Sequence, residues 1–577
     1  MRAADRAVAP VAEDGVKILF IARHFAYFRN YESVIETLAT RGHALHLAAE
    51  RGEELGGRDM VERLAAAHPG ISIGWVPQRE DRWALFATKL RLTIDYLRYL
   101  EPAYDTTPKL RARARERVPY IGLLLLTALR VKTRTGRRLI AAALRACERA
   151  LPRSATIDAF VRDHDPDVVL LTPLIGVVAS PQLDCLQSAT ALGYRTALCV
   201  WSWDHLSSKA IVRQIPDRVF VWNGTQRDEA ITLHGVPPER VVVTGAQCFD
   251  HWFDRQPSID RAIFCRSVGL PPDRPFLLYV CSSLFRGTVT EALFVHRWIR
   301  ALRASGLEPL ASTPILVRPH PARLKEWADV DLSAERDVAL WGQSPVTPDA
   351  KDGYFNSLHH SAAVVGLNTS AFLEAAIVGR PVYATLLPEH YENQEGTIHF
   401  HYLLNVGGGL LHVARTLGEQ AAQLSVCLKA DARESERSRR FVEAFIRPHG
   451  RATPSTPVFT DAVEALQPAP GAARQVRPGQ PGVLLRLVLA PVATVLSLDA
   501  AAGLMASERD RLIAARHQAR RQRALAIRQG KAARKAAQQD EKQARAAARQ
   551  RHKVQRTESW RRAKLAKKWK GRTGLGQ

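Results

Sequence analysis

The 577-residue sequence lacks the cysteine patterns that mark a disulfide framework or a zinc site. Its seven cysteines are scattered and include no Cys-x-x-Cys pair, which predicts free thiols in a reducing cytosol. Residues 1–15 contain no apolar core and do not resemble a secretory signal peptide. No stretch contains the roughly 18 uncharged apolar residues that a membrane-spanning helix needs. These absences favour a cytoplasmic protein.

Two shorter apolar segments need their own interpretation. Residues 120–129 read YIGLLLLTAL, and residues 483–498 are mostly apolar but are interrupted by Arg486 and by a proline at 491. Either segment could form a buried helix, or it could rest in the interface of a membrane.

The positive charge is concentrated in the C-terminal tail. Of the formal net charge of +25, residues 506–577 carry +18, from 23 basic and 5 acidic residues. This alanine-, arginine- and lysine-rich tail favours helix by propensity but has no sustained heptad pattern. Such a charge would bind nucleic acid, acidic polysaccharide or the anionic surface of a membrane. A merely solvated extension is the alternative.

The rest of the chain alternates between strand and helix patterns. Residues 16–22 (VKILFIA) predict a buried strand, followed by an amphipathic helix at 31–40 and a second strand at 44–48. This βαβ order predicts a parallel, doubly wound sheet. Long leucine- and arginine-rich helical patterns interrupt the alternation at about 84–156, as a helical insertion.

A second set of strands begins after residue 250. We expect strands at 276–281, 315–317, 364–367 and 382–385. The predicted fold is therefore α/β, with two Rossmann-like doubly wound domains, a helical insertion and a basic helical C-terminal tail. The predicted boundaries are 16–250, 251–450, a Pro/Gly-rich linker with an apolar segment at 451–505, and the tail at 506–577.

The most informative segment lies between residues 315 and 383. One strand ends in Arg318 and His320, and another ends in the turn Asn368-Thr369-Ser370, which opens a helix containing Glu374. The carboxyl ends of parallel strands meet at the ligand crevice of an open sheet. A helix N-terminus with hydroxyl groups attracts phosphate, and a glutamate one turn later can accept hydrogen bonds from a ribose. The pattern predicts a nucleotide site.

These motifs resemble those of the GT-B glycosyltransferase fold, and of bacterial capsule and surface-polysaccharide transferases in particular. The Arg-Pro-His-Pro run at 318–321 is similar to a motif of CDP-glycerol glycerophosphotransferases. A Ser/Thr turn followed by a helix with Glu and then Gly, Pro and Val is similar to an element of UDP-N-acetylglucosamine 2-epimerases. It is carried here by Ser370, Glu374, Gly379, Pro381 and Val382. Those epimerases carry Gly-Thr-Arg-Pro-Glu after their first strand, where this chain has Ala22-Arg23-His24-Phe25-Ala26. That difference counts against epimerisation.

The resemblance implies transfer of a sugar from a nucleotide-activated donor to a cell-surface glycan or a lipid-linked acceptor. No Asp-x-Asp motif is evident where a metal-dependent transferase would need one, so we expect no metal. The nucleotide sugar would be a substrate, and no cofactor is expected. The tail would then hold a cytoplasmic enzyme on the inner face of the membrane, at an anionic surface or another polyanion. The alternatives are a CDP-polyol phosphotransferase and a non-catalytic polyanion-binding or scaffold protein.

The resemblance also implies roles for residues that follow predicted strands. Because many GT-B enzymes keep their base after the first strand, it implies His24 as the general base, with Asp204 or His205, after another strand, as rivals. GT-B families often place donor-sugar contacts after the strand at 382–385, which implies this role for Glu395 and Thr397. Nucleotide and phosphate binding is expected from Ser282, Ser283, Arg286, Arg318, His320, Asn368, Thr369, Ser370 and Glu374.

Overall fold

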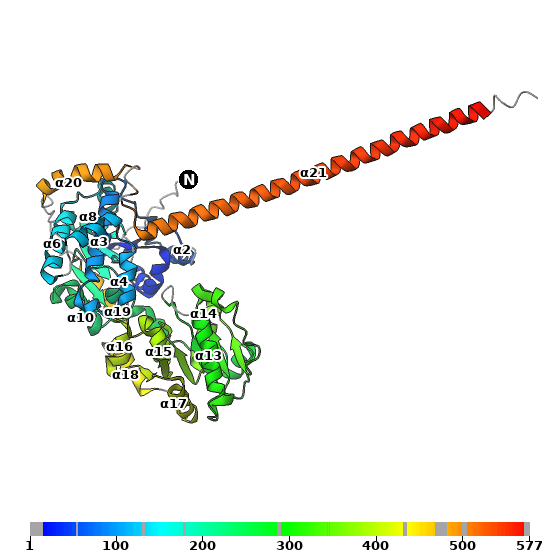
Figure 1. Ribbon diagram of the computed structural model, residues 1–577. Helices are drawn as coiled ribbons and strands as arrows, with labels where there is room; N and C mark the ends of the chain where they lie inside the picture. The colour runs from blue at the N-terminus through cyan, green and yellow to red at the C-terminus, as the bar shows by residue number, and fades with distance from the viewer. Residues whose placement is uncertain are drawn as a thin grey trace, which may run out of the picture. The chain divides into compact units, whose positions relative to one another are not determined.

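The structure is a computed structural model, and it describes residues 15–53, 56–129, 133–176, 180–284, 290–342, 344–345, 347–430, 435–467, 482–498, 503 and 505–570. The chain divides into two compact units, of which the first ends at Met505 and the second begins at Ala506. We call the described residues of the first unit the folded body. Figure 1 shows it as a ribbon with many of its helices labelled.

The first sheet of the folded body has seven parallel strands in the order β3-β2-β1-β4-β5-β6-β7. Alternate side chains of β1 point to opposite faces, because Phe20 lies in one core cluster and Leu19 and Ile21 lie in another. Such double burial explains why the strands read as continuous apolar runs. The strands are β1 (Lys17–Ala22), β2 (Ala44–Ala49), β3 (Ile71–Trp75), β4 (Val168–Thr172), β5 (Arg195–Cys199), β6 (Arg218–Val221) and β7 (Val241–Val243).

Helices cover both faces of this sheet. The residues of α1 that pack on it, Val34, Ile35 and Leu38, have the spacing of an amphipathic helix. The helices around the first sheet are α1 (Glu32–Thr40), α2 (Gly57–Ala67), α7 (Ala155–His164), α8 (Gln182–Ala191) and α10 (Gly224–His234).

The second sheet has six parallel strands in the order β10-β9-β8-β11-β12-β13. In both sheets the order reverses beside the first strand, between β1 and β4 and between β8 and β11, which is the position where doubly wound sheets bind ligands. The strands are β8 (Leu277–Val280), β9 (Ile315–Arg318), β10 (Val338–Leu340), β11 (Ala363–Gly366), β12 (Val382–Thr385) and β13 (Leu411–Ala414).

Helices also pack on both faces of the second sheet, in two core clusters. They are α13 (Glu291–Arg303), α14 (Pro348–His360), α15 (Ala371–Ile377), α17 (Leu417–Lys429) and α18 (Glu436–Phe445), several of which are labelled in Figure 1. The two parallel sheets confirm the predicted pair of Rossmann-like domains.

One segment differs from the linker that its proline and glycine content predicts. Residues Ser455–Glu464 form α19, which packs on α1, and Phe459 lies 5.8 Å from the ring of Tyr31 and 5.1 Å from that of Phe220. The prolines fall before the helix and in its first turn, where helices tolerate them. Asp250 accepts hydrogen bonds from the backbone N–H groups of the first two residues of α19. The chain therefore returns to the first domain after completing the second.

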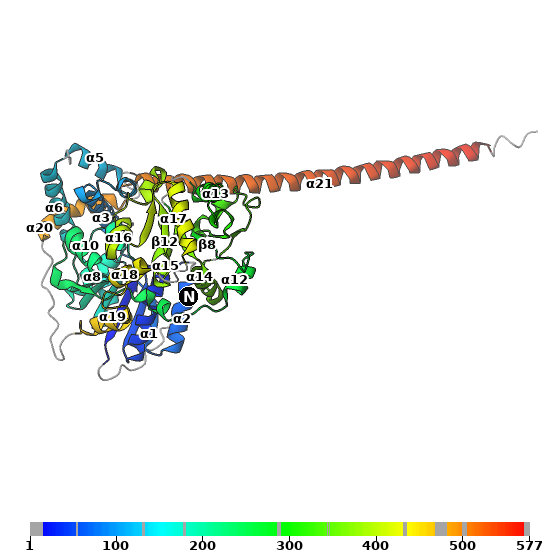
Figure 2. The same ribbon diagram turned by 90° about the horizontal axis from the view of Figure 1, so that it is seen from below.

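The helical insertion lies between β3 and α7, as predicted. It comprises α3 (Ala84–Arg98), α4 (Pro108–Arg115), α5 (Tyr120–Ala128) and α6 (Arg134–Ala150). The later helix α20 (Val483–Leu496) packs on α3 and α6, and Figure 2 shows α5, α6 and α20 at the same end of the folded body.

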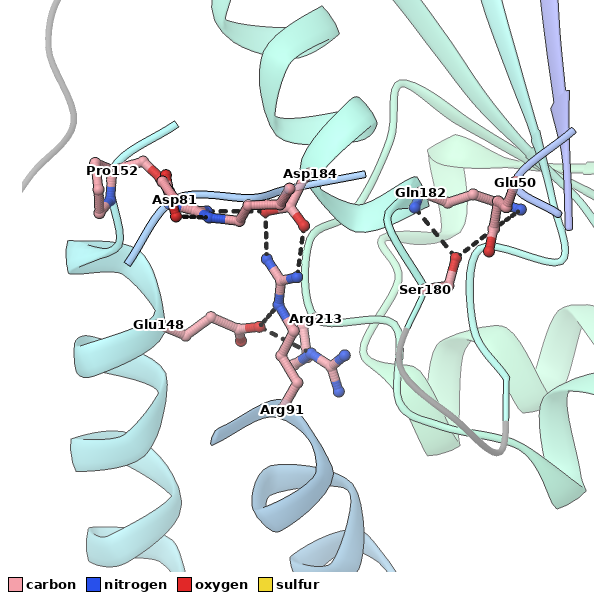
Figure 3. Close-up of polar contacts among 10 residues, drawn as sticks. Glu50, Asp81, Arg91, Glu148, Pro152, Ser180, Gln182, Asp184 and Arg213 are labelled. Carbon is pink, nitrogen blue, oxygen red and sulfur yellow. Dashed lines mark hydrogen bonds and ion pairs between the residues drawn. The ribbon is translucent and has the colours of Figure 1, made fainter. Parts of the chain in front are cut away.

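A buried ion-pair network joins the insertion to the first sheet's helices (Figure 3). Arg91 of α3 donates to both carboxylate oxygens of Asp184 on α8, at 2.7 and 2.8 Å. Arg79 also pairs with Asp184, at 3.2 Å, and Glu148 of α6 lies 3.0 Å from Arg213. Burial alone would raise the pKa of Asp184, but the charges and hydrogen bonds of the two guanidinium groups outweigh it and lower that pKa. The network fixes α3, α6 and α8 relative to one another.

In the second unit, the described residues form one long helix, α21 (Glu508–Lys570), preceded by residues 506–507. The helix contains 22 lysines and arginines and 5 acidic residues. It confirms the predicted basic helical tail. Among the residues that the structure describes, no helix combines the length and apolarity needed to cross a membrane.

Candidate functional site

A cleft of about 1100 Å³ lies at the carboxyl ends of β8, β9 and β11, facing the loop before α2. Five of the predicted site residues line it. They are Arg318, His320, Thr369, Ser370 and Glu374.

Arg318 is the last residue of β9 and is 5% exposed. Its guanidinium carbon lies 4.5 Å from the ring centre of Tyr354 on α14 and 5.4 Å from that of Trp341. Burial lowers the pKa of Arg318, yet a guanidinium remains charged in proteins. The two rings hold a planar cation that can pair with a phosphate through two parallel hydrogen bonds.

Glu374 lies one turn into α15 and accepts a hydrogen bond from the hydroxyl of Tyr354. Burial raises the pKa of Glu374 to about 7, against the opposing effects of the Tyr354 hydrogen bond and the Arg318 charge. Tyr354 thus contacts both the cation and the carboxyl group. The three side chains form one connected unit on the wall of the cleft.

His320 offers a hydrogen-bond donor to the same cleft. Its Nδ1 accepts from the backbone N–H of Ala322 at 3.2 Å, and burial lowers the pKa of its imidazole. In a neutral ring whose Nδ1 accepts, the hydrogen is carried by Nε2. His320 can therefore donate to an anion without being charged itself.

The turn between β11 and α15 contributes hydroxyl groups. Thr369 and Ser370 line the cleft, and Ser370 is exposed. Asn368 does not line it, because its side-chain amide donates to the carbonyl of Asn393 at 2.5 Å and its backbone N–H donates to Ser282. Asn368 shapes the turn that presents its two neighbours.

Ser282 is likewise used inside the protein. It is fully buried; its backbone N–H donates to Glu291 at 2.6 Å, and its hydroxyl donates to the same carboxyl group at 3.2 Å. Burial raises the pKa of Glu291 to about 8. Ser283 is exposed but does not line the cleft. Arg286 lies outside the described residues.

The two expected donor-sugar residues do not line the cleft. Glu395 pairs with Arg415 at 3.0 Å, and Thr397 is 1% exposed and donates to the carbonyl of Gln394. The Gln394 side chain in turn donates to the carbonyls of Leu367 and Thr385. These contacts brace the loop against β11 and β12.

None of the three expected bases lines the cleft. His24 stacks edge-on with Tyr27 at 4.6 Å, and burial lowers its pKa to about 4. His205 is fully buried against the carbonyl of Ile175 and its pKa is also lowered to about 4, chiefly by burial. Burial would raise the pKa of Asp204, but Lys209 at 2.7 Å brings it well below its usual range. An aspartate held so strongly as an anion is a weak base.

The first domain reaches the cleft through a different loop. Glu53, Gly56, Arg58 and Asp59, which follow β2, line its other side. The backbone N–H of Gly57, the first residue of α2, donates to the Glu53 carboxylate at 2.8 Å. The sequence analysis did not identify these residues. Their only signal is that they follow β2, which, like β1, ends at the edge of the sheet where ligands bind. Among the described residues, no group of three or more histidine, cysteine or acidic side chains could hold a metal ion.

Gly342 provides the space that Arg318 occupies. Its φ is +129°, and a Cβ at this position would lie 2.6 Å from Nη1 of Arg318. We expect Gly342→Ala to displace the guanidinium and to weaken binding of a nucleoside diphosphate about tenfold or more, measured by isothermal calorimetry. Gly306→Ala is the matched control, because Gly306 has a φ of +66° with open space around it. Equal nucleotide affinity in the two variants would contradict the assignment.

Comparison with known proteins shows similarity of fold only. No family model matches the chain, and no curated protein matches it. A UDP-GlcNAc 2-epimerase from Methanocaldococcus jannaschii is 11% identical, with a TM-score of 0.45, over 77% of this chain and 99% of that one.

Two further solved structures are similar to the same extent. A glycosyltransferase from Rickettsia africae is 10% identical, with a TM-score of 0.44, over 78% of this chain and 98% of that one. A UDP-GlcNAc 2-epimerase from Neisseria meningitidis, bound to UDP-GlcNAc, is 10% identical, with a TM-score of 0.43, over 78% of this chain and 100% of that one. The function of this chain must therefore be inferred from the side chains in its own cleft.

Proposed function

We propose that this chain is a glycosyltransferase that moves a sugar from a nucleotide-activated donor to a cell-surface glycan or a lipid-linked acceptor without a metal ion. The observation that carries the proposal is the unit of Arg318, Tyr354 and Glu374 beside His320 in one cleft. A cleft of about 1100 Å³ is large enough for a nucleotide sugar.

The chemistry assigns a role to each wall residue. Sugar transfer needs the departing diphosphate to be neutralised as its charge develops. Arg318 supplies a fixed positive charge, and His320, Thr369 and Ser370 supply neutral donors. Glu374, when ionised, accepts hydrogen bonds from two hydroxyl groups of a ribose. Together these groups recognise both ends of a nucleoside diphosphate.

The acceptor hydroxyl must also lose a proton as the new bond forms. Glu53 and Asp59 line the cleft opposite the phosphate-binding residues, whereas His24, Asp204 and His205 do not. A base has to come within hydrogen-bond reach of its proton. We therefore favour Glu53 or Asp59 for this role.

A panel of UDP-, GDP-, CDP-, CMP- and dTDP-linked ligands tests the proposal on the full chain. One nucleotide class should raise the melting temperature, because a ligand at 100 times its Kd adds about 2.7 kcal/mol to the stability of the native state. Incubation with the matching donor should then release UDP or GDP. Release of CMP from a CDP-linked ligand would indicate the rival polyol-phosphate transfer. Absence of binding across the whole panel, with the protein folded, would favour a non-catalytic scaffold.

The raised pKa of Glu374 predicts pH-dependent donor binding. Its carboxyl group is protonated below about pH 7, and only the ionised form accepts two ribose hydrogen bonds. The affinity for a nucleotide sugar should therefore rise about tenfold between pH 6 and pH 8, since binding releases a proton. The diphosphate of the ligand does not titrate in this range.

Two variants separate Glu374 from other titrating groups. Tyr354→Phe removes a hydrogen bond that lowers the pKa of Glu374, so its affinity curve should move to higher pH. Glu374→Gln should bind weakly and without this pH dependence. A curve that keeps its shape in Glu374→Gln would assign the titration to another residue.

The basic helix α21 is proposed to bind a polyanion such as an anionic membrane surface, with the protein peripheral on the cytoplasmic side. The proposal rests on the electrostatic attraction between its 22 basic residues and a negatively charged surface.

A further inference from the structure

The helical insertion of the folded body is strongly cationic. Residues 84–150 contain 15 basic and 5 acidic residues, a net charge of +10, whereas the rest of the first 505 residues carries −3. Of these residues, Glu148 is buried and Asp95 nearly so, both paired with Arg213, and four basic residues are buried as well: Lys89, Arg91, Arg98 and Arg117. Basic residues still outnumber acidic ones among the remainder. The surface of the insertion is therefore dominated by positive charge.

The same part of the molecule exposes an apolar helix face. On α20, Leu484, Leu487 and Val488 are 81%, 65% and 69% exposed. The opposite side of α20 packs on the insertion through Ala493, which is fully buried. Its single charged residue, Arg486, donates to the carbonyl of Ala150 on α6. Soluble proteins rarely leave contiguous apolar patches of this kind without a partner.

A second apolar face lies on α5. Its large exposed side chains are 39–58% accessible, and Leu139 of α6 adds another at 67%. They are Tyr120, Ile121, Leu124, Leu125 and Leu129.

Helix α6 connects the two faces. Its Leu144 packs against both small cores, one containing Leu126 of α5 and the other Ala493 of α20. Arg138, Arg145 and Arg149 of α6 are exposed. Figures 1 and 2 both show α6 and α20 at the same end of the folded body. We call the exposed residues of α5, α6 and α20 the insertion face.

We propose that the insertion face docks the folded body on the surface of an anionic lipid bilayer. Apolar helix faces enter the boundary between headgroups and acyl chains, and arginines pair with lipid phosphates. The charge selects this occupant, because a second copy of the chain would bring the same positive charge to the contact. A nucleic acid would satisfy the arginines but not the leucines. This surface is separate from the cleft and does not depend on the proposed catalytic function.

Binding of the full chain to vesicles tests the proposal. Vesicles of phosphatidylcholine with 30% phosphatidylglycerol should bind the protein more tightly than phosphatidylcholine alone. The variants are Leu484→Glu/Val488→Glu on α20 and, as a matched control, Val426→Glu on α17, whose side chain is 68% exposed. In 0.5 M NaCl, which screens binding by charge alone, the wild type and the control should stay bound. The double variant should lose at least about tenfold in partition coefficient.

Hydrogen exchange locates the contact. On vesicles, amide exchange should slow in residues 120–129 and 483–498 and remain unchanged in α17. Exchange that slows only in α21 would mean that the tail alone binds lipid and would overturn the proposal. Equal loss of binding in the double variant and in Val426→Glu would do the same. A dimer in the absence of vesicles, abolished by Leu484→Glu/Val488→Glu, would identify a second copy as the true occupant.

Discussion

Replacing Asp184 with alanine is expected to lower the free energy of unfolding by about 3–5 kcal/mol, because breaking a buried ion pair leaves its partners charged and unsolvated. The Arg91 and Arg79 side chains beside Asp184 are only 4% and 5% exposed. Arg91 cannot reach water without moving α3, whereas Arg79 keeps its pair with Asp81 and its hydrogen bond to the carbonyl of Pro152. The variant should therefore melt well below the wild type, as measured by circular dichroism on the full chain.

Asp81→Ala is the matched control for this prediction. Asp81 also pairs with Arg79, at 2.8 Å, but its side chain is 38% exposed. Water can replace an exposed carboxylate, but Asp81 also accepts a hydrogen bond from the backbone N–H of Trp83, just before α3. The change should therefore cost about 1–2 kcal/mol, less than the loss of Asp184. If the two variants melted at the same temperature, the buried network would not be what holds the insertion in place.

Acidification provides a second check on Asp184. Its pKa is lower in the folded protein than in the unfolded chain, so the ionised form contributes stability that is present at neutral pH. That contribution is lost as the pH falls from about 4 through the folded pKa. The difference between the wild type and Asp184→Ala should therefore shrink below pH 4. A difference that stayed constant down to pH 2 would contradict the role of the charge.

The parts of the site that follow from sequence are those set by strand ends. Arg318 and Ser370 are far apart in the chain, but parallel strands bring their carboxyl ends to one edge, so their meeting in the cleft could be expected. The apolar runs of both sheets were readable for the same reason, because strands buried on two faces carry few polar residues.

Contacts to the site from helices that carry no recognisable motif could not be predicted from the sequence. Tyr354 lies on α14, which carries no motif, yet its hydroxyl meets Glu374 and its ring stacks on Arg318. Nothing in the sequence marked Gly342, because its role is to leave open the space that the Arg318 side chain occupies. Both depend on packing between elements that the sequence does not fix locally.

For polar residues at strand ends, the sequence does not distinguish ligand binding from hydrogen bonding inside the protein. Ser282 and Thr369 both follow buried strands, and a hydroxyl that binds a ligand has the same local sequence as one used internally. The two differ because Glu291, at the start of α13, accepts hydrogen bonds from the backbone N–H and the hydroxyl of Ser282. Burial, rather than residue type, decides which of the two is available to a ligand.

Arg318→Ala should produce the largest loss of activity of any single change in the cleft. Hydrogen bonds to a charged group are worth about 1.5–3 kcal/mol, and a donor that stabilises developing charge is worth about 10²–10³ in kcat. The rings of Tyr354 and Trp341 already hold the guanidinium, so little ordering cost is left for binding. We expect kcat/KM for the donor identified by the ligand panel to fall by at least about 10²-fold. Arg318→Lys should restore only part of it, because an ammonium group lacks the planar pair of donors.

Replacing one glutamate inside the cleft and one outside it tests whether the donor binds in the cleft. Glu374→Gln should weaken donor binding, because an amide cannot replace a carboxylate that accepts two hydroxyl hydrogen bonds, whereas Glu395→Gln should lose only an exposed ion pair with Arg415. The opposite ranking would move the donor sugar to the loop around Glu395 and away from the cleft. Full activity in Arg318→Ala would mean that no diphosphate binds at the end of β9. Because Arg318 and Glu374 both contact Tyr354, their combined replacement should cost less than the sum of the single changes.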